Sequence, residues 1–327
     1  MGLRGRGHAL APVLIAATLA VLAGCGDDEG SGTASPGADG TTAVTVQDVA
    51  GIPSEFLTAG VKQGFFEKRG LDVTVQEAAG GAAIIPAVVS GDAQIGGSNV
   101  VSALIAAEKK LPLAMVAAGT FGPRTEEDDW SAILVKGDAI SSPKELEGTT
   151  MAVNTLNNVA TETAVAALEN AGVDASKVEF TEVDFPDMLA ALDGGRVDSI
   201  FEIEPFVTAG EAQGFRRVLA PYHGTRPDLQ IGSYVMSREY LGKNPQIAEA
   251  FRAGVQDTAS WVQENPDEFR KALAANGVKG AEDLRLPTWK GAIDPASLEA
   301  HVQLMQRQGL IEEAPALEDL LAPGATG

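Results

Sequence analysis

Polar side chains and glycines stand just after the β-branched runs of this sequence, where the binding sites of α/β proteins commonly form. Their hydroxyl, amide and carboxylate groups suit the reversible capture of a small molecule by hydrogen bonds. None of them pairs a nucleophile with an adjacent base, so we expect no catalytic residue among them. The candidate ligand-binding residues are Ser54, Phe56, Gly81, Ser98, Asn99, Thr120, Phe121, Asn154, Thr155, Asn157, Asp184 and Glu204.

Ordinary structural roles compete with ligand binding at several of these positions. Ser98 and Asn157 also suit helix N-caps, and Gly81 with the glycine before it also suits a tight turn. Glu204, which precedes a proline, also suits the end of a strand. The candidate loops contain no Lys or Arg, which disfavours a bare inorganic anion, although helix N-termini can hold a sulfonate or carboxylate. Glu55 and Glu204 favour an amine or a ring N–H donor instead.

Enzymatic chemistry finds little support in the remaining residue types. Beyond the leader the histidines are His223, in a predicted loop, and His301, at helical spacing from Leu298 and Met305. We expect His301 to be half-buried on its helix. The sequence has no Walker motif, no His-Glu-x-x-His motif and no second cysteine. We therefore predict no metal, no cofactor and no enzyme activity.

The elements that position these residues alternate between short β-branched runs and helical patterns, which predicts a parallel α/β sheet. The predicted strands are 43–46, 71–75, 113–117, 132–135, 151–153, 178–183 and 199–201. Helices are expected where a proline follows an N-cap residue, and only helices are expected beyond residue 245. These starts are Pro143, Pro245, Pro266 and Pro295.

The first 25 residues have the parts of a secretory leader that ends in a cysteine. Arg4 and Arg6 precede an uncharged stretch too short to span a membrane, and Leu22-Ala-Gly-Cys25 follows. This tetrapeptide resembles the bacterial lipobox, whose cysteine receives a diacylglyceryl group. The resemblance implies a signal peptide over residues 1–24 and lipidation of Cys25 with acyl chains such as palmitate. The polar composition that follows predicts a lipidated flexible tether over residues 25–42.

Composition limits the partners and the size of the core. The formal net charge of −21 disfavours nucleic acid and anionic lipid surfaces, although solubility outside the cell also explains such acidity. With 327 residues, of which 45% are apolar, the chain can bury one or two substantial cores. A two-lobed protein is therefore expected.

Four segments of the chain together form a family pattern. They are VKQGFFEKRGLDV at 61–73, the glycine turn SGDAQI at 90–95, LEGTTMAV at 146–153, and 187–206, which ends in Glu-Pro-Phe. Their order and spacing resemble the solute-binding proteins of the nitrate, sulfonate and taurine importers, a group that includes binders of thiamine-pyrimidine precursors. In that family the first glycine turn usually continues into an Asp, where this chain has Gln94, whereas the second turn keeps Asp198. The role of position 94 is therefore a question for the structure.

The resemblance implies the periplasmic binding protein type II fold, an α/β fold of two Rossmann-like lobes with a ligand cleft between them. Lobe 1 is expected to comprise 43–137 plus 238–327, and lobe 2 is expected to comprise 138–237. The implied function is capture of a small organic solute and its delivery to the membrane permease of an ABC importer. A sulfonate or taurine-like compound and a thiamine-precursor-like heteroaromatic are the implied solutes.

The same resemblance implies a monomer, anchored through Cys25 on the outer face of the cytoplasmic membrane. Two alternative functions stay open at this level. One is a ligand-sensing receptor. The other is a thiamine-pyrimidine synthase-like enzyme on the same fold, which the lack of a cysteine-rich iron motif disfavours.

Overall fold

The computed structural model describes residues 35–36 and 40–327. Its first sheet contains β1 (Ser35–Pro36), β2 (Thr42–Val49), β3 (Leu71–Ala78), β4 (Ile95–Asn99), β5 (Leu113–Ala118) and β12 (Gly232–Ser237). β2 pairs in parallel with β3 and β4, whereas β12 pairs antiparallel with both β4 and β5. The sheet is therefore mixed, and the prediction of a parallel sheet is wrong for β12.

The second sheet has the order β11-β7-β10-β8-β9 and is also mixed. Its strands are β7 (Ser131–Val135), β8 (Thr150–Val153), β9 (Glu179–Glu182), β10 (Ser199–Ile203) and β11 (Arg216–Leu219). β8 pairs in parallel with β9 and β10, and β7 pairs antiparallel with β10 and β11. Two short strands, β6 (Thr120–Phe121) and β13 (Thr288–Trp289), pair antiparallel and form a separate sheet. The expectation of helices only beyond residue 245 is therefore wrong at β13.

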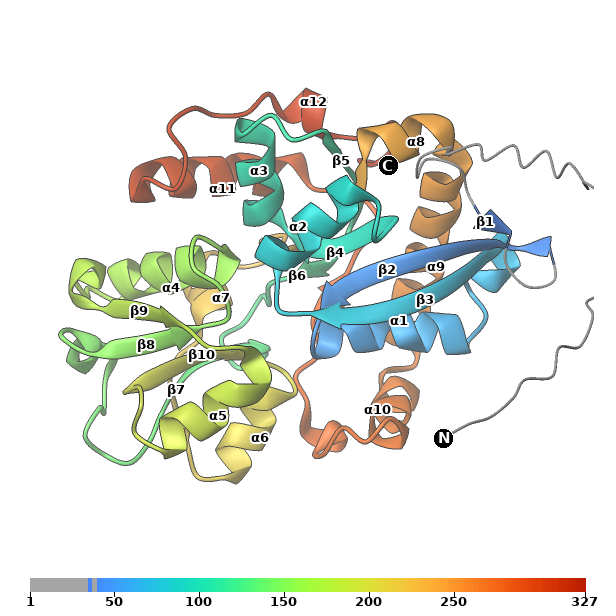
Figure 1. The fold of residues 1–327 in the computed structure, drawn as a ribbon. Coiled ribbons are helices and arrows are strands. Elements are labelled where there is room, and N and C mark those ends of the chain that lie inside the picture. The colour runs from blue at the N-terminus through green and yellow to red at the C-terminus, as the bar shows by residue number, and fades with distance from the viewer. Residues whose placement is uncertain (1–34, 37–39) are drawn as a thin grey trace, which may run out of the picture. The chain divides into compact units, whose positions relative to one another are not determined.

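The chain changes sheets earlier than the predicted lobe boundaries. β7 belongs to the second sheet although it falls within the predicted lobe 1, and β12 belongs to the first sheet although it falls within the predicted lobe 2. Figure 1 shows β7 beside β10, away from β2 and β3. Both strands are buried, so hydrophobicity predicts that they are strands but not which sheet they join.

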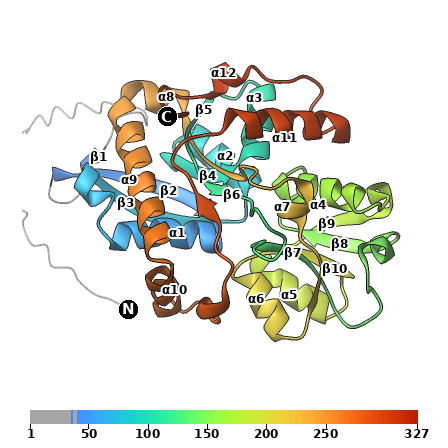
Figure 2. The ribbon, with the colours of Figure 1, turned by 180° about the vertical axis from the view of Figure 1, so that it is seen from behind.

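Helices cover the faces of the first sheet. α9 packs against α1 and β5, while α2 and α3 pack against β4 and β12 on the other face (Figures 1 and 2). The prolines at 245, 266 and 295 begin α9, α10 and α11 as predicted. The helices are α1 (Ile52–Lys62), α2 (Gly81–Ser90), α3 (Val100–Glu108), α8 (Arg238–Lys243), α9 (Pro245–Glu264), α10 (Pro266–Ala275), α11 (Pro295–Gln308) and α12 (Leu317–Leu320).

The helices of the second sheet are α4 (Val159–Asn170), α5 (Phe185–Asp193), α6 (Phe206–Ala212) and α7 (Pro221–Thr225). α5 and α6 pack on β10, and α7 packs on α4 and β7. Pro143 begins only a short 3-10 helix, Pro143–Leu146, so the helix predicted there is a single turn. Within the described residues, every helix is too short or too polar to cross a lipid bilayer.

The glycine turns before Gln94 and Asp198 are each followed by a side chain that accepts a hydrogen bond from a neighbouring strand. Gln94 Oε1 accepts a hydrogen bond from the Thr45 amide at 2.9 Å, and Asp198 Oδ2 accepts one from the Thr150 amide at 2.9 Å. Each bond holds the start of the next strand against its neighbour. An amide oxygen therefore replaces the carboxylate in the first half of the chain.

The leader and the lipidation site at Cys25 lie outside the described residues. The end of the predicted tether is not a free chain, because Ser35 and Pro36 pair with Ala43 and Thr42. Backbone pairing of this kind needs no buried side chain, so a polar composition does not exclude it.

Candidate functional site

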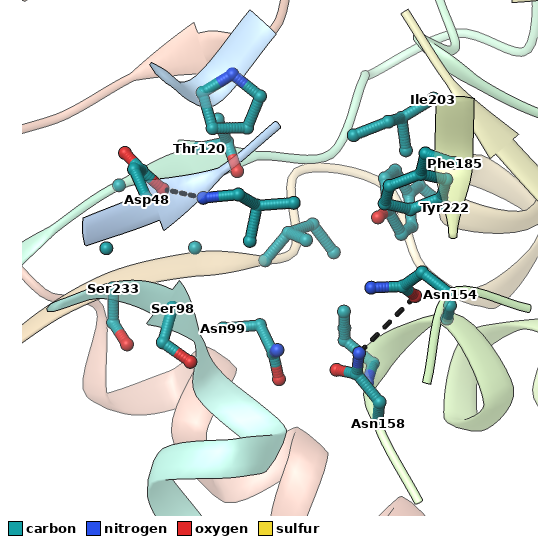
Figure 3. Close-up of a pocket in the computed structure, with 18 of the residues that line it drawn as sticks. Asp48, Ser98, Asn99, Thr120, Asn154, Asn158, Phe185, Ile203, Tyr222 and Ser233 are labelled. Carbon is teal, nitrogen blue, oxygen red and sulfur yellow. Dashed lines mark hydrogen bonds between the residues drawn. The ribbon is translucent and has the colours of Figure 1, made fainter. Parts of the chain in front are cut away.

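A cavity of about 50 Å³ is lined by residues from both sheets (Figure 3). The first sheet supplies Asp48 from β2, Ser98 and Asn99 from β4, and Ser233 from β12, and the second supplies Ile203 from the end of β10. One water needs about 10–15 Å³ of such space, so the cavity has room for a small molecule. Because β12 runs antiparallel, its first residues lie beside the carboxyl end of β4.

Asp48 of β2 is the carboxylate that lines the cavity from the first sheet, next to Tyr234 of β12. It continues the alternation of the buried Val44 and Val46, and its side chain is 3% exposed. Oδ1 accepts a hydrogen bond from the Val49 amide at 2.7 Å, and the Tyr234 hydroxyl also donates to the carboxylate. Burial raises the pKa of Asp48 to about 7, against the lowering effect of the Val49 amide and the Tyr234 hydroxyl.

Gly97 makes room for this carboxylate. It lies in β4 opposite Tyr234 of β12, and a Cβ atom at position 97 would lie 2.3 Å from Asp48 Cγ. Any larger residue would therefore push the carboxylate away from its position. The position of the Asp48 side chain therefore depends on the glycine at position 97 of β4.

Two serine hydroxyl groups lie on the face of the sheet opposite to Asp48, because Ser98 and Ser233 alternate with Gly97 and Tyr234 along their strands. Ser98 and Ser233 are directly opposite each other in the β4–β12 pair, and both line the cavity. Neither Oγ atom has a hydrogen-bond partner among the residues that the structure describes. Buried polar groups almost always have partners, so a water or a solute that reaches these two hydroxyl groups would satisfy them.

The opposite side of the cavity is formed by asparagines whose polar atoms are bonded within the protein. Asn154 Nδ2 donates to the Ala79 carbonyl at 2.9 Å, which links the end of β8 to the chain after β3. Asn158 is the N-cap residue of α4; its Oδ1 accepts from the Val159 amide at 2.6 Å, and its Nδ2 donates to Thr155 Oγ1. These hydrogen bonds hold the asparagine side chains in place without a solute.

Aromatic side chains complete the wall on the side of the second sheet. The rings of Trp130 and Tyr222 pack with centroids 4.7 Å apart, and Trp130 Nε1 donates to the Phe121 carbonyl at 3.0 Å. Phe185 and Ile203 add apolar surface (Figure 3). Among the described residues, no Lys or Arg lines this cavity. The site is a small chamber whose exposed lining is mostly apolar, with the carboxyl group of Asp48 and a few other polar groups around it.

The structure brings Ser98, Asn99, Thr120 and Asn154 of the predicted site residues to the cavity. It places Gly81, Thr155 and Asn157 around a separate surface depression beside α2 and α3. Ser54 donates instead to the Gly51 carbonyl and to Glu77, and Asp184 is exposed at the start of α5.

The other predicted site residues lie in the core. Phe56 stacks on Trp289 with ring centroids 4.4 Å apart. The ammonium group of Lys290 lies over the Phe121 ring, 4.0 Å from its centroid. Glu204 is fully buried; it accepts from the Thr208 amide at 3.0 Å and forms an ion pair with Arg285 at 3.2 Å. Burial raises the pKa of Glu204, and these partners lower it. Glu204 therefore fastens α6 to the C-terminal segment and is not a lining residue of the cavity.

The cavity lining includes residues that are absent from the predicted site, among them Asp48, Trp130, Asn158, Tyr222 and Ser233. One signal was present: Val44, Val46 and Asp48 share one face of a strand, so a carboxylate occupies an inward position. The predicted strand ends at residue 46, so it does not extend this pattern to Asp48.

The buried histidine corrects another expectation. His301 is fully buried rather than half-buried, and its Nδ1 lies 2.8 Å from Glu162 Oε2 while its Nε2 lies 2.8 Å from the Gln230 carbonyl. Burial lowers the pKa of His301, but Glu162 and the Gln230 carbonyl outweigh it and the pKa is raised. The pair joins α11 to the first turn of α4, directly behind the cavity wall. His223 is tied by its backbone amide to Asp129 and does not line the cavity.

Comparison with known proteins identifies a relative by sequence. One relative, the taurine-binding periplasmic protein of Escherichia coli, is 26% identical over 207 residues, which are 63% of this chain and 62% of the relative. The chain thus matches less than two thirds of that protein's length.

Solved structures share the fold at low sequence identity. The alkanesulfonate-binding protein SsuA of Xanthomonas axonopodis pv. citri bound to MOPS superposes with a TM-score of 0.73 at 16% identity, over 86% of this chain and 98% of that one. A Candida albicans protein described as having the generic periplasmic binding protein fold gives a TM-score of 0.68 at 14% identity, over 87% and 97%. The fold is therefore the α/β periplasmic binding protein fold.

The sequence profile of the family described as NMT1/THI5 like matches residues 54–269. This segment contains most of the strands and helices that form the cavity, including the ends of β4, β8 and β10. The chain belongs to the NMT1/THI5-like family.

Proposed function

We propose that this chain is the extracytoplasmic solute-binding protein of an ABC importer, which captures a small polar organic solute and delivers it to a membrane permease. The observation that carries this proposal is the cavity between the two sheets, where the buried hydroxyl groups of Ser98 and Ser233 have no partner in the described part of the chain. A taurine-binding relative and an alkanesulfonate-binding structural neighbour support small organic sulfonates as the first solutes to examine.

Each sheet with its helices would act as one lobe, and the protein would work as a monomer without nucleic acid. The lobe boundaries that we propose follow the sheets, so β7 belongs to lobe 2 and β12 to lobe 1. Hydrogen bonds already cross between the two, from Asn154 Nδ2 to the Ala79 carbonyl and from the Ile52 amide to the Glu204 carbonyl at 3.2 Å. A solute that contacts both lobes would favour this closed arrangement by its differential affinity.

We propose binding without catalysis. His301 is held by Glu162 and Gln230, and neither His301 nor His223 lines the cavity. In the described residues no cluster of His, Cys, Asp and Glu is arranged to hold a metal ion. The serines of the cavity have no base within hydrogen-bonding distance among the described residues, so no activated nucleophile supports an enzyme.

The membrane anchor at Cys25 is a second part of the proposal. A diacylglyceryl group would hold the protein on the outer face of the cytoplasmic membrane, because two acyl chains give stable attachment. Cys25→Ala should leave a folded domain that partitions into the aqueous phase of a detergent extraction. Equal partitioning of the wild type and the variant would contradict the anchor.

Thermal unfolding in the presence of candidate solutes tests the binding function. Taurine, alkanesulfonates, nitrate and thiamine-pyrimidine precursors should be compared on the Cys25→Ala chain, and a true solute at 100 times its Kd should add about 2.7 kcal/mol of stability. Small-angle scattering should then show a smaller radius of gyration with the solute bound. If no small polar molecule stabilises the protein, the proposed function is wrong.

A further inference from the structure

Resting on the proposed solute-binding function, we propose that Arg285 is a positioning residue of the solute site, which holds the two lobes in the closed arrangement from outside the cavity. Arg285 follows α10, which packs on α1 and α9 of lobe 1. Its partners are Glu204 at the end of β10 and Glu211 of α6, both in lobe 2. We call these three residues the clasp. All three lie outside the lining of the cavity, so the clasp acts on a solute only through the arrangement of the lobes.

The clasp uses both terminal nitrogens of the guanidinium group. Arg285 Nη1 lies 3.2 Å from Glu204 Oε1 and 3.0 Å from Glu211 Oε2, and Nη2 donates to Glu211 Oε1 at 3.3 Å. The backbone amide of Arg285 also donates to Glu204 Oε1 at 3.3 Å. A guanidinium group that binds a carboxylate through two nitrogens fixes its direction as well as its distance. The clasp therefore favours one angle between the lobes.

The backbones of the two lobes also approach closely beside the clasp. The Ile52 amide donates to the Glu204 carbonyl at 3.2 Å. Gly51, with a φ of 110°, lies against the same carbonyl, and a Cβ atom there would be 3.1 Å from the oxygen. A Cβ atom at Gly280, where φ is 67°, would lie 3.0 Å from Thr208 Cγ2 of α6. Two glycines of lobe 1 thus permit the approach that brings Arg285 to its partners.

The clasp can open without leaving a buried carboxylate bare. The side chain of Glu204 is fully buried, whereas those of Arg285 and Glu211 are 27% and 33% exposed. Glu204 also accepts from the Thr208 amide at 3.0 Å and from the Thr208 hydroxyl at 2.9 Å, and both groups belong to lobe 2. If the lobes separate, these two bonds remain, and water can reach Arg285 and Glu211. Such a contact can bias the closed arrangement and still be reversible.

The same C-terminal part of the chain holds lobe 2 at a second point. His301 of α11 binds Glu162 of α4, and its Nε2 lies 2.8 Å from the Gln230 carbonyl, just before β12. Arg285 Nε likewise donates at 3.2 Å to the Glu127 carbonyl, in the connection that leads to β7. Each of these side chains lies beside one of the two connections between the sheets. A clasp in this place controls the angle at the connections and does not cover the mouth of the cavity.

Distances between two spin labels test the clasp without any solute. Cys25 is the single cysteine of the chain, so labels can be attached in the Cys25→Ala background at Ala190→Cys of α5 and Ala274→Cys of α10. Both alanines are exposed, and the two helices, one on each lobe, lie toward the lower side of both ribbon views (Figures 1 and 2). Double electron–electron resonance should give a short distance in the wild type and longer, broader distances in Arg285→Gln and Glu211→Gln.

Salt and solute provide two further measurements. Raising NaCl from about 0.05 M to about 0.5 M should lengthen the wild-type distance, because salt screens the half-exposed charges, and should change the two variants less. A closed arrangement that is favoured in advance lowers the cost of binding. With taurine, or with whichever compound of the thermal series stabilises the wild type, calorimetry should show a Kd about 5- to 30-fold higher in both variants.

Asp193→Asn is the matched control, because it removes an ion pair with Lys136, at 2.7 Å, that lies within lobe 2. Circular dichroism should confirm folding, and Glu211→Gln alone decides the outcome if Arg285→Gln does not fold. If the folded variants keep the wild-type distances, or if the distances lengthen while the Kd stays the same, the inference is overturned although solute binding stands. If the distances lengthen but no compound stabilises the wild type, the clasp holds the lobes and the proposed function fails.

Discussion

The two edges of the cavity are both polar and buried, but they differ in how their hydrogen bonds are used. On the edge of the first sheet, Ser98 and Ser233 keep hydroxyl groups without partners in the described chain. On the edge of the second sheet, the side chains of Asn154 and Asn158 form hydrogen bonds with other groups of the protein. The difference indicates that the first edge selects the solute by its chemistry, whereas the second edge forms a prearranged wall.

The second edge is also supported from behind. Glu162 lies one turn into α4, the helix that Asn158 caps, and His301 of α11 binds its carboxylate. Fixed groups of this kind lower the cost of ordering a site when a solute binds. The first edge needs no such support, because its residues lie within paired strands.

The largest effect should come from breaking this support. His301→Gln leaves Glu162 buried without its cationic partner, which typically costs about 3–5 kcal/mol. Denaturant unfolding should show that loss and a weaker solute affinity. His223→Gln is the control, because the fixed contact of His223 uses its backbone, and it should change stability little.

The same variant should alter the pH dependence of stability. The raised pKa of His301 means that its stabilising contribution is complete below the unfolded value of about 6.5 and is lost as pH rises through the folded value. The wild type should therefore lose stability over that range, and His301→Gln should lose less. An unchanged pH profile would show that the pair does not hold the second edge in place.

A smaller effect should separate the two edges through their asparagines. Asn99 Oδ1 caps α3 by accepting from the Ser102 amide at 2.8 Å, so Asn99→Ala should cost about 1 kcal/mol of stability. Asn154 reaches across to the Ala79 carbonyl, so Asn154→Ala should mainly weaken solute binding, by about 2- to 12-fold. Calorimetry and chemical unfolding measure the two quantities. If Asn99→Ala mainly weakened binding and Asn154→Ala mainly lowered stability, the proposed difference between the two edges would be wrong.

Sequence reasoning reached those asparagines because residues that follow strands are recognisable, and it also placed the helix starts at Pro245, Pro266 and Pro295 correctly. It missed Ser233, because nothing local shows that β12 runs antiparallel between β4 and β5. It misjudged Glu204, because the partner that occupies this carboxylate, Arg285, lies 81 residues away. Burial and pairing across the fold, rather than local pattern, decide which polar groups remain available to a solute.

The smallest effect concerns the far ends of the strands, where the two halves of the molecule are alike. Gln94→Glu and Asp198→Asn each exchange amide and carboxylate while keeping the oxygen that accepts from Thr45 or Thr150. Because the acceptor is preserved and lies away from the cavity, unfolding free energies should change by less than about 0.5 kcal/mol and solute affinity should not change. Asp198→Ala, which removes the acceptor, should cost more than Asp198→Asn. A large loss in Gln94→Glu alone would mean that the bond from Gln94 Nε2 to the Gly91 carbonyl also matters, and that the two turns are alike only in part.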